Sequence, residues 1–463
     1  MMDRLWDISA ANMVALMKPD TPLAIIGDGL AGAMLVWHLN QLGRDMQQIT
    51  LFGTNSPGLG KAYGGIHPDL RLNVRDNLMN VTLDGGFARW AKTNIDDDNA
   101  TTDSGMFFRR RDFGRYVEHL VAPVMAAGVT QIKAQVTQLI KPQAGTPFWR
   151  LITPLGETTA AQVVLALGNP TPQPPFEVSD DGQQNGQQNG PGNSVIVSPW
   201  YGDWPDTVDP DAEVAIIGSG LTAMDALLIL SNRNHQAPIH LISPRAALPP
   251  RQAAWQPQDA VDWPKLTSAA AFSRFFRAYL ADDDWNSARW QESFESLRGG
   301  ISAAWQSLPT AERQRLLGRF ASWWQMARYR AGPQTSDAAA AMLNSGQLNL
   351  IEGRAGKIHT TAAGQVAIDL GDRVQNADQV IMAIGAGRDV LMMRMAADGV
   401  VAGNDHGTPV DHRLRVTGDD CRPIDGLYAI GPQTAFSRGD IIGAAGVSRE
   451  ARLLAETLME DAA

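Results

Sequence analysis

The stretch that decides the fold is Leu23-Ala24-Ile25-Ile26-Gly27-Asp28-Gly29-Leu30-Ala31-Gly32, a short apolar run that leads into three spaced glycines. The same pattern returns later in the chain as Val214-Ala215-Ile216-Ile217-Gly218-Ser219-Gly220-Leu221-Thr222-Ala223. At such a strand-to-helix junction the first glycine makes a tight turn, the second lets the backbone approach a pyrophosphate, and the third position keeps helix and strand close. The helix N-terminus offers N–H groups and the positive end of its dipole to the phosphates. One motif is weak evidence, because a glycine-rich turn without a ligand has the same letters, but two predict two dinucleotides on one polypeptide.

Composition sets the class of protein. A length of 463 residues predicts two or three domains, and contents of 44% hydrophobic and 19% charged residues are typical of globular proteins. The net charge of −10 argues against a nucleic-acid partner or a polybasic membrane anchor. No apolar run reaches transmembrane length, and residues 1–20 lack the basic start and apolar core of a signal peptide. We therefore expect a cytoplasmic protein.

The cysteine count excludes one chemistry. Cys421 is the single cysteine, so the chain forms no intramolecular disulfide and has no Cys-x-x-Cys pair. Two-dinucleotide enzymes that pass electrons to a protein disulfide need such a pair. Enzymes that relay electrons through a disulfide of their own chain are therefore excluded.

The order of elements predicts an α/β fold with two Rossmann-like dinucleotide-binding domains and a helical insertion. We expect the first domain at 1–176 and 386–463, a linker at 177–194 whose residues 179–193 form a surface loop, the second domain at 195–256 and 332–385, and a Trp-rich helical insertion at 257–331. The first domain is discontinuous because the strand 426–431 and the helix 446–459 return to complete it. Further expected elements are the helices 31–42 and 222–232 and the strands 48–52, 163–168, 239–243 and 380–385.

Several further stretches resemble a known family. They are Leu59-Gly60-Lys61-Ala62-Tyr63-Gly64, Leu72-Asn73-Val74, Phe87-Ala88-Arg89-Trp90, Arg110-Arg111-Asp112-Phe113-Gly114-Arg115-Tyr116, Ser243-Pro244-Arg245 and Trp305-Gln306-Ser307-Leu308-Pro309. Together they are similar to the bacterial FAD/NAD(P)-binding family that includes flavin-dependent urate hydroxylase-like proteins. The resemblance spans nearly the whole chain and implies FAD in the first domain and NADPH in the second.

The resemblance and the motifs together predict the cofactor-binding residues. For FAD they are Gly27, Gly29, Leu30, Ala31, Gly32, Lys61, Tyr63, Asn73, Val74, Arg110, Gly168, Gly431, Asp440 and Ile441. For the nicotinamide coenzyme they are Gly218, Gly220, Leu221, Thr222, Arg245 and Gly385.

Three of these residues carry a specific expectation. As in the family, Asn73 is expected beside the isoalloxazine. Arg110 belongs to a basic cluster at 109–111 that could reach the FAD pyrophosphate or an anionic substrate; the alternative is a solvated helix start. Arg245 follows a strand at the place where an NADP enzyme holds the 2′-phosphate, and because 241–245 contains no acid, NADPH is favoured. The alternative for Arg245 is a solvated side chain at a strand end.

The departures from the family are as informative as the matches. Gly53 stands where family members carry the acid that binds the FAD ribose. Its loss weakens FAD binding unless a neighbour such as Asn55 substitutes for the acid. Asp28 puts a carboxylate inside the first glycine motif. Ile441 aligns with another acidic position. The family's "HRHR" element reads Ala327-Arg328-Tyr329-Arg330, so both arginines remain without the histidines.

These departures bear on the substrate, and we do not carry urate hydroxylation over to this chain. Asn73, Arg328 and Arg330 are the candidate catalytic residues. The two arginines are candidates for an anionic group of the substrate; the alternative is an ion pair with the acidic run 282–284. The tryptophans of the insertion form either an aromatic lid or, more commonly for helical tryptophans, a core.

The functional hypothesis follows from what the chain lacks. No spacing in the sequence indicates a metal site or a Gly-x-Ser-x-Gly nucleophile, and in a flavoenzyme the cofactor carries the difficult chemistry. The leading hypothesis is an FAD- and NADPH-dependent monooxygenase that uses O2 on a small-molecule substrate. The alternatives are a flavin-dependent reductase or dehydrogenase of an organic substrate, and a nucleotide-binding partner protein with weakened FAD affinity. The oligomeric state stays open.

Overall fold

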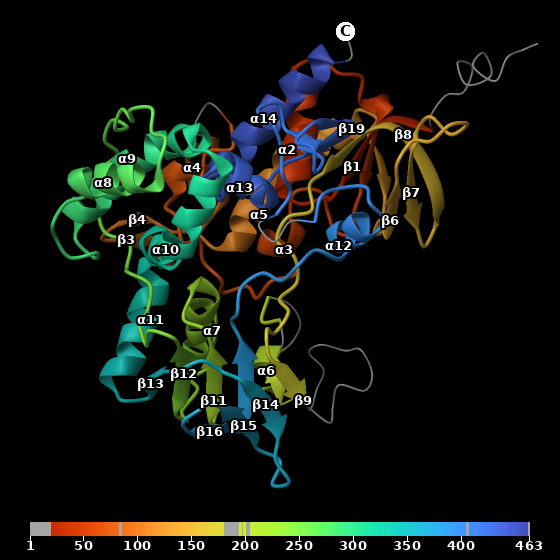
Figure 1. The fold of residues 1–463 in the computed structure, drawn as a ribbon. Helices are drawn as coiled ribbons and strands as arrows, with labels where there is room; N and C mark the ends of the chain where they lie inside the picture. Colours follow the sequence, from red (N-terminus) through yellow and green to blue (C-terminus); the bar gives the residue numbers. More distant parts are fainter. Residues whose placement is uncertain are drawn as a thin grey trace, which may run out of the picture. The chain divides into compact units, whose positions relative to one another are not determined.

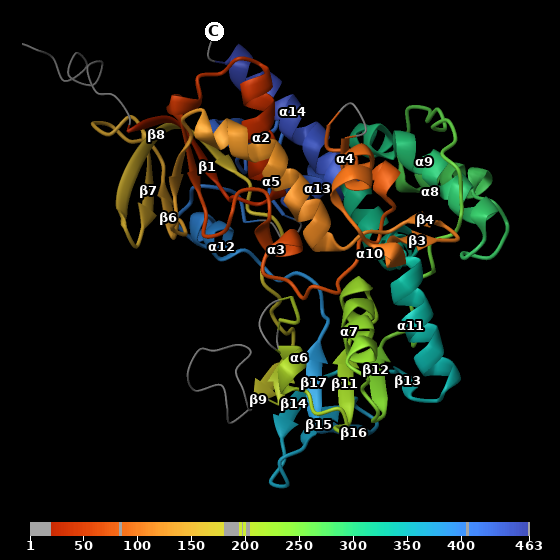
Figure 2. The same cartoon turned by 180° about the vertical axis from the view of Figure 1, so that it is seen from behind.

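The computed structural model describes residues 20–82, 86–179, 194–196, 198–200, 204–403 and 407–461. It divides into two compact units, which we treat separately. Unit 1 comprises Met1–Gly60, Val117–Gly168 and Asp389–Ala463, and unit 2 comprises Lys61–Tyr116 and Asn169–Arg388 (Figure 1, Figure 2). The N-terminal residues 1–19 and the predicted loop residues 180–193 lie outside the described part of the chain.

Unit 1 is built on a mixed sheet with the strand order β18-β19-β8-β1-β2-β5. Its parallel centre consists of β19 (Pro423–Ala429), β8 (Gly156–Leu165), β1 (Thr21–Ile26), β2 (Ile49–Phe52) and β5 (Thr130–Ile132). β6 (Gln138–Ile140), β7 (Trp149–Thr153) and β18 (Arg415–Thr417) add antiparallel pairs. All four residues of β2 are buried, which is expected for a parallel strand covered on both faces.

Helices cover both faces of this sheet. α2 (Leu30–Gln41) and the closing helix α14 (Ala444–Glu460) lie side by side, and His38 Nε2 and Ser448 Oγ are 3.0 Å apart across them (Figure 1). α12 (Val390–Ala397) packs near β6, with Leu391 and Met395 in the same core as Leu139. The short helix α13 (Ala435–Arg438) precedes α14.

Unit 2 contains a parallel sheet with the order β10-β17-β11-β12-β13. The strands are β10 (Val195–Ile196), β17 (Gln379–Met382), β11 (Val214–Ile217), β12 (Ile239–Ser243) and β13 (Leu348–Glu352). α7 (Leu221–Asn232) and α11 (Pro333–Asn344) pack on one core, and the second sheet, β16-β15-β14-β9, packs on another. Its strands are β9 (Glu177–Ser179), β14 (Lys357–Thr360), β15 (Val366–Asp369) and β16 (Val374–Ala377). α6 (Trp204–Thr207) completes this part.

Two further parts belong to unit 2. Residues 61–116 carry α3 (Gly60–Tyr63), α4 (Gly86–Asn94), the small hairpin β3 (Thr101–Thr102) and β4 (Gly105–Met106), and the start of α5 (Arg110–Ala126). The helical insertion contains α8 (Ala269–Tyr279), α9 (Ala288–Ser307) and α10 (Thr310–Arg328). Its ends lie side by side, because Gln252 N donates to Ala331 O over 2.9 Å and Ala331 N to Pro250 O over 2.8 Å.

The fold-class prediction is confirmed, and most elements lie within two or three residues of their predicted bounds. The C-terminal strand returns to the first sheet as predicted, since β19 pairs in parallel with β8. Three strands end earlier than predicted: β8 at Leu165, β17 at Met382 and β19 at Ala429. The residues up to Gly168, Gly385 and Gly431 leave the sheets in turns, and these glycines have φ of 68°, 85° and 92°.

The predicted domain bounds remain a prediction, but the structure groups some segments differently. Residues 61–116 join unit 2 through buried polar contacts such as that between Arg110 and Asp225. The first three residues of the predicted linker form β9, which pairs with β14. Within the described residues, no helix is both long and apolar enough to cross a membrane.

Candidate cofactor sites and a buried arginine cluster

The first glycine loop connects β1 to α2 in unit 1. Gly27 has φ of 116°, and a Cβ built there lies 2.2 Å from Ala166 O at the end of β8. Gly32 is equally constrained, since its Cβ would lie 2.0 Å from Gly27 O. Gly29 is the N-cap of α2, with φ of −72° and no side-chain hydrogen bond to cap the helix among the described residues. The loop thus has the close backbone approach that a dinucleotide pyrophosphate requires, and a helix N-terminus that no described side chain caps.

Neighbouring segments of unit 1 cover this first loop. Gly58 N donates to Asp28 O over 2.7 Å, and a Cβ at Gly29 would lie 3.6 Å from Gly60 Cα. On the C-terminal side, a Cβ at Gly431 would lie 3.4 Å from Ala31 Cβ. Four residues predicted to bind FAD, namely Gly29, Ala31, Gly32 and Gly431, therefore lie together.

Glu450 is a residue of this region that sequence reasoning missed. It is 3% exposed and accepts hydrogen bonds from Gly431 N (3.1 Å) and the Thr434 hydroxyl (3.0 Å). Arg438 Nε donates to its other oxygen over 3.2 Å. Burial raises the pKa of Glu450, and these hydrogen bonds and Arg438 oppose the rise. Glu450 thereby holds the turn after β19 in place. The only signal in the sequence was an acid on an otherwise apolar face of α14.

Two further predicted FAD residues lie near this turn. Gly168 O accepts a hydrogen bond from Gln433 Nε2 over 3.4 Å, which ties the end of β8 to the 3₁₀ turn Pro432–Thr434. Ile441 is 7% exposed and packs under the start of α14, while Asp440 is half-buried beside it. The apolar side chain at position 441 is therefore part of the packing of unit 1.

Asp28 occupies space next to Gly53. Its carboxylate is 4% exposed and accepts a hydrogen bond from Asn55 N over 2.6 Å. A Cβ built on Gly53 would lie 2.0 Å from Asp28 Cγ. Burial raises the pKa of Asp28, against the lowering effect of Asn55. Asn55 therefore holds the Asp28 side chain inward, against the end of β2.

The second glycine loop connects β11 to α7 in unit 2 and repeats the first in backbone detail. Gly218 has φ of 106°, and its Cβ would lie 2.3 Å from Ala383 O. Gly220 is the N-cap of α7, again with no side-chain cap among the described residues. Around Gly220 and Gly385 a Cβ would meet no described residue within 4 Å, so within the described part of unit 2 this loop is open. Leu221 and Thr222 begin α7 at half-buried positions.

Arg245 lies at the end of β12, as predicted. The side chain is exposed, and Nη1 donates to Ser322 O over 3.3 Å. A single long hydrogen bond to a carbonyl leaves most guanidinium donors of Arg245 for a ligand. Its role toward a 2′-phosphate stays a prediction.

The structure corrects the interpretation of Arg110. This arginine is 6% exposed, and its Nη2 contacts both carboxylate oxygens of Asp225 at 2.8 and 2.9 Å, while Nε donates to Arg71 O. Asp225 lies on α7 and is itself 5% exposed. Arg110 is therefore neither a solvated residue nor positioned as an unpaired anion ligand: it joins residues 61–116 to the rest of unit 2.

Of the other predicted residues of this segment, Lys61 and Tyr63 belong to α3, and Asn73 and Val74 lie on a loop. Lys61 is exposed and donates to Thr171 Oγ1 over 2.9 Å, and the Tyr63 ring packs 4.9 Å from that of Phe113. Asn73 and Val74 are half-buried. Asn73 O accepts from Gln252 Nε2 over 2.9 Å, so Asn73 lies against the start of the helical insertion.

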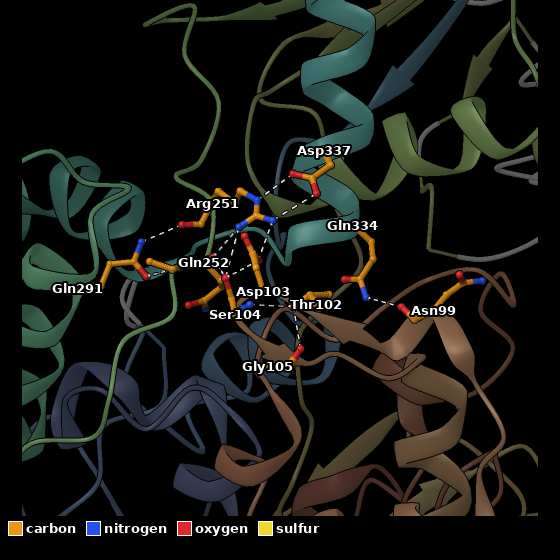
Figure 3. Close-up of polar contacts among 11 residues, drawn as sticks. Asn99, Thr102, Asp103, Ser104, Gly105, Arg251, Gln252, Gln291, Gln334 and Asp337 are labelled. Atoms are coloured by element: carbon orange, nitrogen blue, oxygen red, sulfur yellow. Dashed lines mark hydrogen bonds and ion pairs between the residues drawn. The ribbon is translucent and has the colours of Figure 1, made fainter.

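Arg251 anchors that start, as Figure 3 shows. Its guanidinium pairs with Asp337 of α11 at 2.8 Å and with Asp103 of the β3–β4 hairpin at 3.0 Å. Gln291 of α9 donates to Arg251 O over 2.8 Å and accepts from Ala253 N over 2.9 Å. These contacts fix the start of the insertion to α11 and to the β3–β4 hairpin.

A polar cavity of about 720 Å³ lies beside these ion pairs of Arg251. Its lining includes Arg71, Arg109, Arg251, Asp103, Asp337 and Asn232. All three of these arginines have an acidic partner: Arg71 and Arg109 pair with Asp97 at 3.0 and 4.0 Å, and Arg251 pairs with Asp337. No group of three metal-ligating side chains occurs anywhere in the described ranges.

The tryptophans of the insertion form its core. Trp290 is 2% exposed and stacks on Trp285 and Phe294 with ring centroids at 5.5 and 5.2 Å. Trp263, Trp323 and Trp324 pack against the same cluster. The core alternative is confirmed over the aromatic lid for these residues.

Arg330 has a different partner from the one considered. It is 3% exposed and pairs through Nη2 with Glu295 of α9, not with residues 282–284. Burial would raise the pKa of Glu295, but Arg298, Arg330 and Arg328 outweigh it and hold that pKa below its usual value. Arg328 lies over the Tyr329 ring at 5.5 Å. Sequence analysis therefore found two members of a cluster whose acid, Glu295, it missed.

Comparison with known proteins agrees with this architecture. Residues 24–170 match the FAD-NAD(P)-binding family, which confirms the coarser part of the resemblance. No curated protein matches the chain.

Solved structures match over almost the whole chain. Ornithine hydroxylase from Pseudomonas aeruginosa is 17% identical, with a TM-score of 0.64 over 96% of this chain and 100% of that one. The cadaverine monooxygenase from Erwinia amylovora is 13% identical, with a TM-score of 0.61 over 96% and 95%. Bacillithiol disulfide reductase from Staphylococcus aureus is 12% identical, with a TM-score of 0.55 over 95% and 98%. At such identities the likeness concerns the fold, which oxygenases and a reductase share.

Proposed function

We propose that this protein is an FAD-dependent, NADPH-using monooxygenase of a small metabolite, and that it works in the cytoplasm. The observation that carries the proposal is the pair of glycine loops, which are alike in backbone but differ in cover. The first lies under the segments of Gly58 to Gly60 and Gly431, as suits a cofactor that stays bound. The second is open, as suits a coenzyme that must exchange in every turnover.

Different residues of the chain would bind the two cofactors. Gly27, Gly29 and the N-terminus of α2 would hold the FAD pyrophosphate, and Gly218, Gly220 and the N-terminus of α7 that of NADPH. Arg245 would hold the 2′-phosphate. When bound, FAD supplies the redox chemistry: a hydride comes from NADPH, one atom of O2 enters the substrate and the other leaves as water.

Two observations favour oxygenation over the alternatives. The single Cys421 is exposed and has no cysteine partner, so a protein disulfide cannot relay electrons. Hydroxylases of ornithine and cadaverine share the fold over nearly their whole length. Urate hydroxylation is not part of the proposal, because the two histidines of that element are absent at 327 and 329.

Gly29→Val and Gly220→Val test the assignment of the two loops. Both glycines have ordinary negative φ values of −72° and −80°, and a Cβ at either position is accommodated without a close contact. The variants should therefore fold, while the added side chain fills the space of the phosphates. Gly29→Val should purify without flavin, and Gly220→Val should keep flavin but lose binding of NADPH. If both variants retain wild-type flavin content and coenzyme affinity, the assignment is wrong.

Oxygen use separates the enzymatic alternatives. With a true substrate the monooxygenase should consume NADPH and O2 together, with one O2 for each NADPH, and transfer labelled oxygen to the product. Substrate-stimulated NADPH consumption that continues without O2 would instead identify a reductase. Absence of flavin binding in the wild-type protein would support the nucleotide-binding partner protein.

A further inference from the structure

Two buried arginines of unit 2 have N–H groups without an acceptor in the described part of the chain. Arg75 is 8% exposed, and its Nε and Nη2 are unpaired. Arg330 is 3% exposed, and its Nε and Nη1 are unpaired, although Nη2 contacts Glu295. Buried donors almost always have partners, and an exception is explained by a missing ion, water or ligand. Unpaired donors on two neighbouring cations indicate an anion.

Both arginines belong to one cluster around Glu295. The Glu295 carboxylate acts electrostatically on Arg75 and on Arg330, and Arg298 and Arg328 act on it in turn. Asp76 also acts on Arg75, so the cluster holds four guanidinium groups and two acids. Burial lowers the pKa of Arg330 to about 10, so it keeps its charge at neutral pH. A buried excess of positive charge is costly unless a further anion compensates it.

Aromatic and amide side chains hold the two arginines in place. Arg75 lies 4.2 Å from the centroid of the Trp255 ring, and Arg330 lies 5.5 Å from that of Phe294. Trp255 Nε1 donates to Gln252 Oε1 over 3.4 Å. Gln252 in turn contacts Asn73, the residue for which the family resemblance implies a place beside the flavin. The cluster is therefore connected to the expected position of the reaction.

We propose that Arg75 and Arg330 bind the carboxylate of the substrate, which is then a small organic acid; this rests on the proposed monooxygenase function. A planar carboxylate matches the parallel donors of a guanidinium group and accepts two hydrogen bonds. It brings one negative charge, whereas a phosphate would bring a second charge next to Glu295. The phosphates of the two cofactors have helix N-termini of their own.

Binding measurements on the purified holoprotein test this proposal without turnover. The probes are a panel of small carboxylates, the matching amines without the carboxylate, and inorganic phosphate and chloride, all followed by calorimetry. At least one carboxylate should bind, and Arg75→Met and Arg330→Met should each weaken it tenfold or more. Arg289→Met, on the exposed face of α9, is the matched control and should leave binding unchanged. The proposal is overturned if no carboxylate binds, or if phosphate and chloride bind equally well.

A thermal melt of Arg75→Met separates binding from a structural role. Without ligand, removal of an unpaired buried charge should leave the melting temperature unchanged or raise it. A lowered melting temperature with unchanged carboxylate affinity would make Arg75 structural. Carboxylate binding that fails to stimulate NADPH consumption would leave the site intact and reject the oxygenase. If an uncharged substrate stimulates NADPH consumption, and neither Arg75→Met nor Arg330→Met changes that stimulation, the oxygenase is supported and the carboxylate site is rejected.

A separate observation in unit 1 carries a second inference. The acid that binds the ribose in dinucleotide folds follows the second strand, and Gly53 stands there in this chain. The Asp28 carboxylate fills the place where a side chain at Gly53 would begin, with 2.2 Å between its Oδ2 and the Cβ built there. Asn55 N and Nδ2 donate to the two oxygens at 2.6 and 3.5 Å, which leaves further lone pairs. We infer that Asp28 supplies the ribose-binding carboxylate from the glycine loop itself.

FAD titration of the apoprotein tests the role of Asp28. Asp28→Asn keeps the shape but loses the charge, so FAD should bind ten- to a hundredfold more weakly. The exchanged variant Asp28→Gly/Gly53→Asp should recover most of the affinity, because it returns the acid to the usual position. Wild-type or tighter FAD binding by Asp28→Asn would overturn the inference, since it would show that the carboxylate repels the phosphates.

Discussion

The two glycine loops share a backbone and its contacts with the neighbouring strands, but they differ in the segments that cover them. Gly27 faces Ala166 O and Gly218 faces Ala383 O, so that a Cβ would lie 2.2 or 2.3 Å away. In both, the loop glycine N–H donates to the end of the neighbouring strand over 2.8 Å. Yet Gly58, Gly60 and Gly431 pack around the first loop, whereas a Cβ at Gly220 in the second would meet no described residue within 4 Å. On the proposed function, the backbone common to the two loops would bind a dinucleotide, and the neighbouring segments would decide whether that ligand is retained or exchanged.

The helices after the loops also differ at matching positions. α2 carries Met34 and His38 where α7 carries Asp225 and Ile229. Asp225 connects α7 to Arg110, whereas His38 connects α2 to Ser448. Each unit therefore has its own polar contact between the nucleotide helix and a distant segment, and the following variants exchange or remove them.

The largest effect is expected at the buried ion pair of unit 2. Asp225→Met, which copies α2, leaves Arg110 charged and unpaired, and should destabilise the protein by about 3–5 kcal/mol. Arg110→Met/Asp225→Met should recover most of that loss, because no buried charge remains. Denaturant unfolding of the single and double variants measures both. A single variant as stable as wild type would show that the pair contributes nothing to stability.

A similar effect is expected at the third glycine position. Gly32→Ala puts a Cβ 2.0 Å from Gly27 O, a backbone atom that cannot move away cheaply, and should cost about 3 kcal/mol. Ala223 stands at the matching place in the second loop, so Ala223→Gly is the control and should cost only about 1 kcal/mol. If thermal melts show the same loss of stability for Gly32→Ala and Ala223→Gly, the two loops do not differ in the residue that they accept at this position.

His38 should make stability depend on pH. Burial first, with help from Arg452, lowers the pKa of His38 to about 4 from 6.5. Because the folded state binds the proton less readily, His38 stabilises the protein above pH 6.5, and this contribution is lost as pH falls toward 4. The loss is about 2–3 kcal/mol at pH 4.

His38→Gln isolates that contribution from the other titrating groups. The free energy of unfolding of the variant, measured from pH 7 to 4, should fall less steeply than that of the wild type. Parallel pH profiles for the two proteins would contradict the buried, neutral state of His38.

The smallest effect is expected at the coenzyme's 2′-phosphate. Arg245→Ala should raise the Michaelis constant for NADPH ten- to a hundredfold, or about 1.5–3 kcal/mol, and should barely change that for NADH. Arg233→Ala removes another arginine of unit 2, paired with Asp206, and serves as the control. An equal effect of Arg245→Ala on both coenzymes would place the 2′-phosphate elsewhere.

Sequence analysis predicted the elements that depend on local pattern. β12 matches residue for residue, and both glycine loops, α7 and the return of β19 lie where the apolar runs and glycines indicate them. A short run of β-branched residues before spaced glycines leaves the backbone few alternatives. The Trp-rich composition indicated the helical insertion, and the family resemblance indicated its arginines.

The contacts that sequence analysis missed join residues far apart in the chain. Arg110 and Asp225 are 115 positions apart, and Arg330 and Glu295 are 35 apart. Periodicity shows which face of a helix is buried but does not show which charge lies opposite. Likewise, Gly53 and Asp28 look like two separate departures in the sequence, and only the structure shows that one makes room for the other.

The central claim is that the covered loop of unit 1 retains FAD and that the open loop of unit 2 binds NADPH. The most direct measurement is an anaerobic titration of the purified protein with NADPH, followed by the visible absorption of the flavin. The account predicts that the protein is yellow as purified and that about one equivalent of NADPH per flavin bleaches it, with NADH much less effective. A colourless protein that takes up no added FAD, or a bound flavin that NADPH does not reduce even in the presence of small carboxylates, would contradict it.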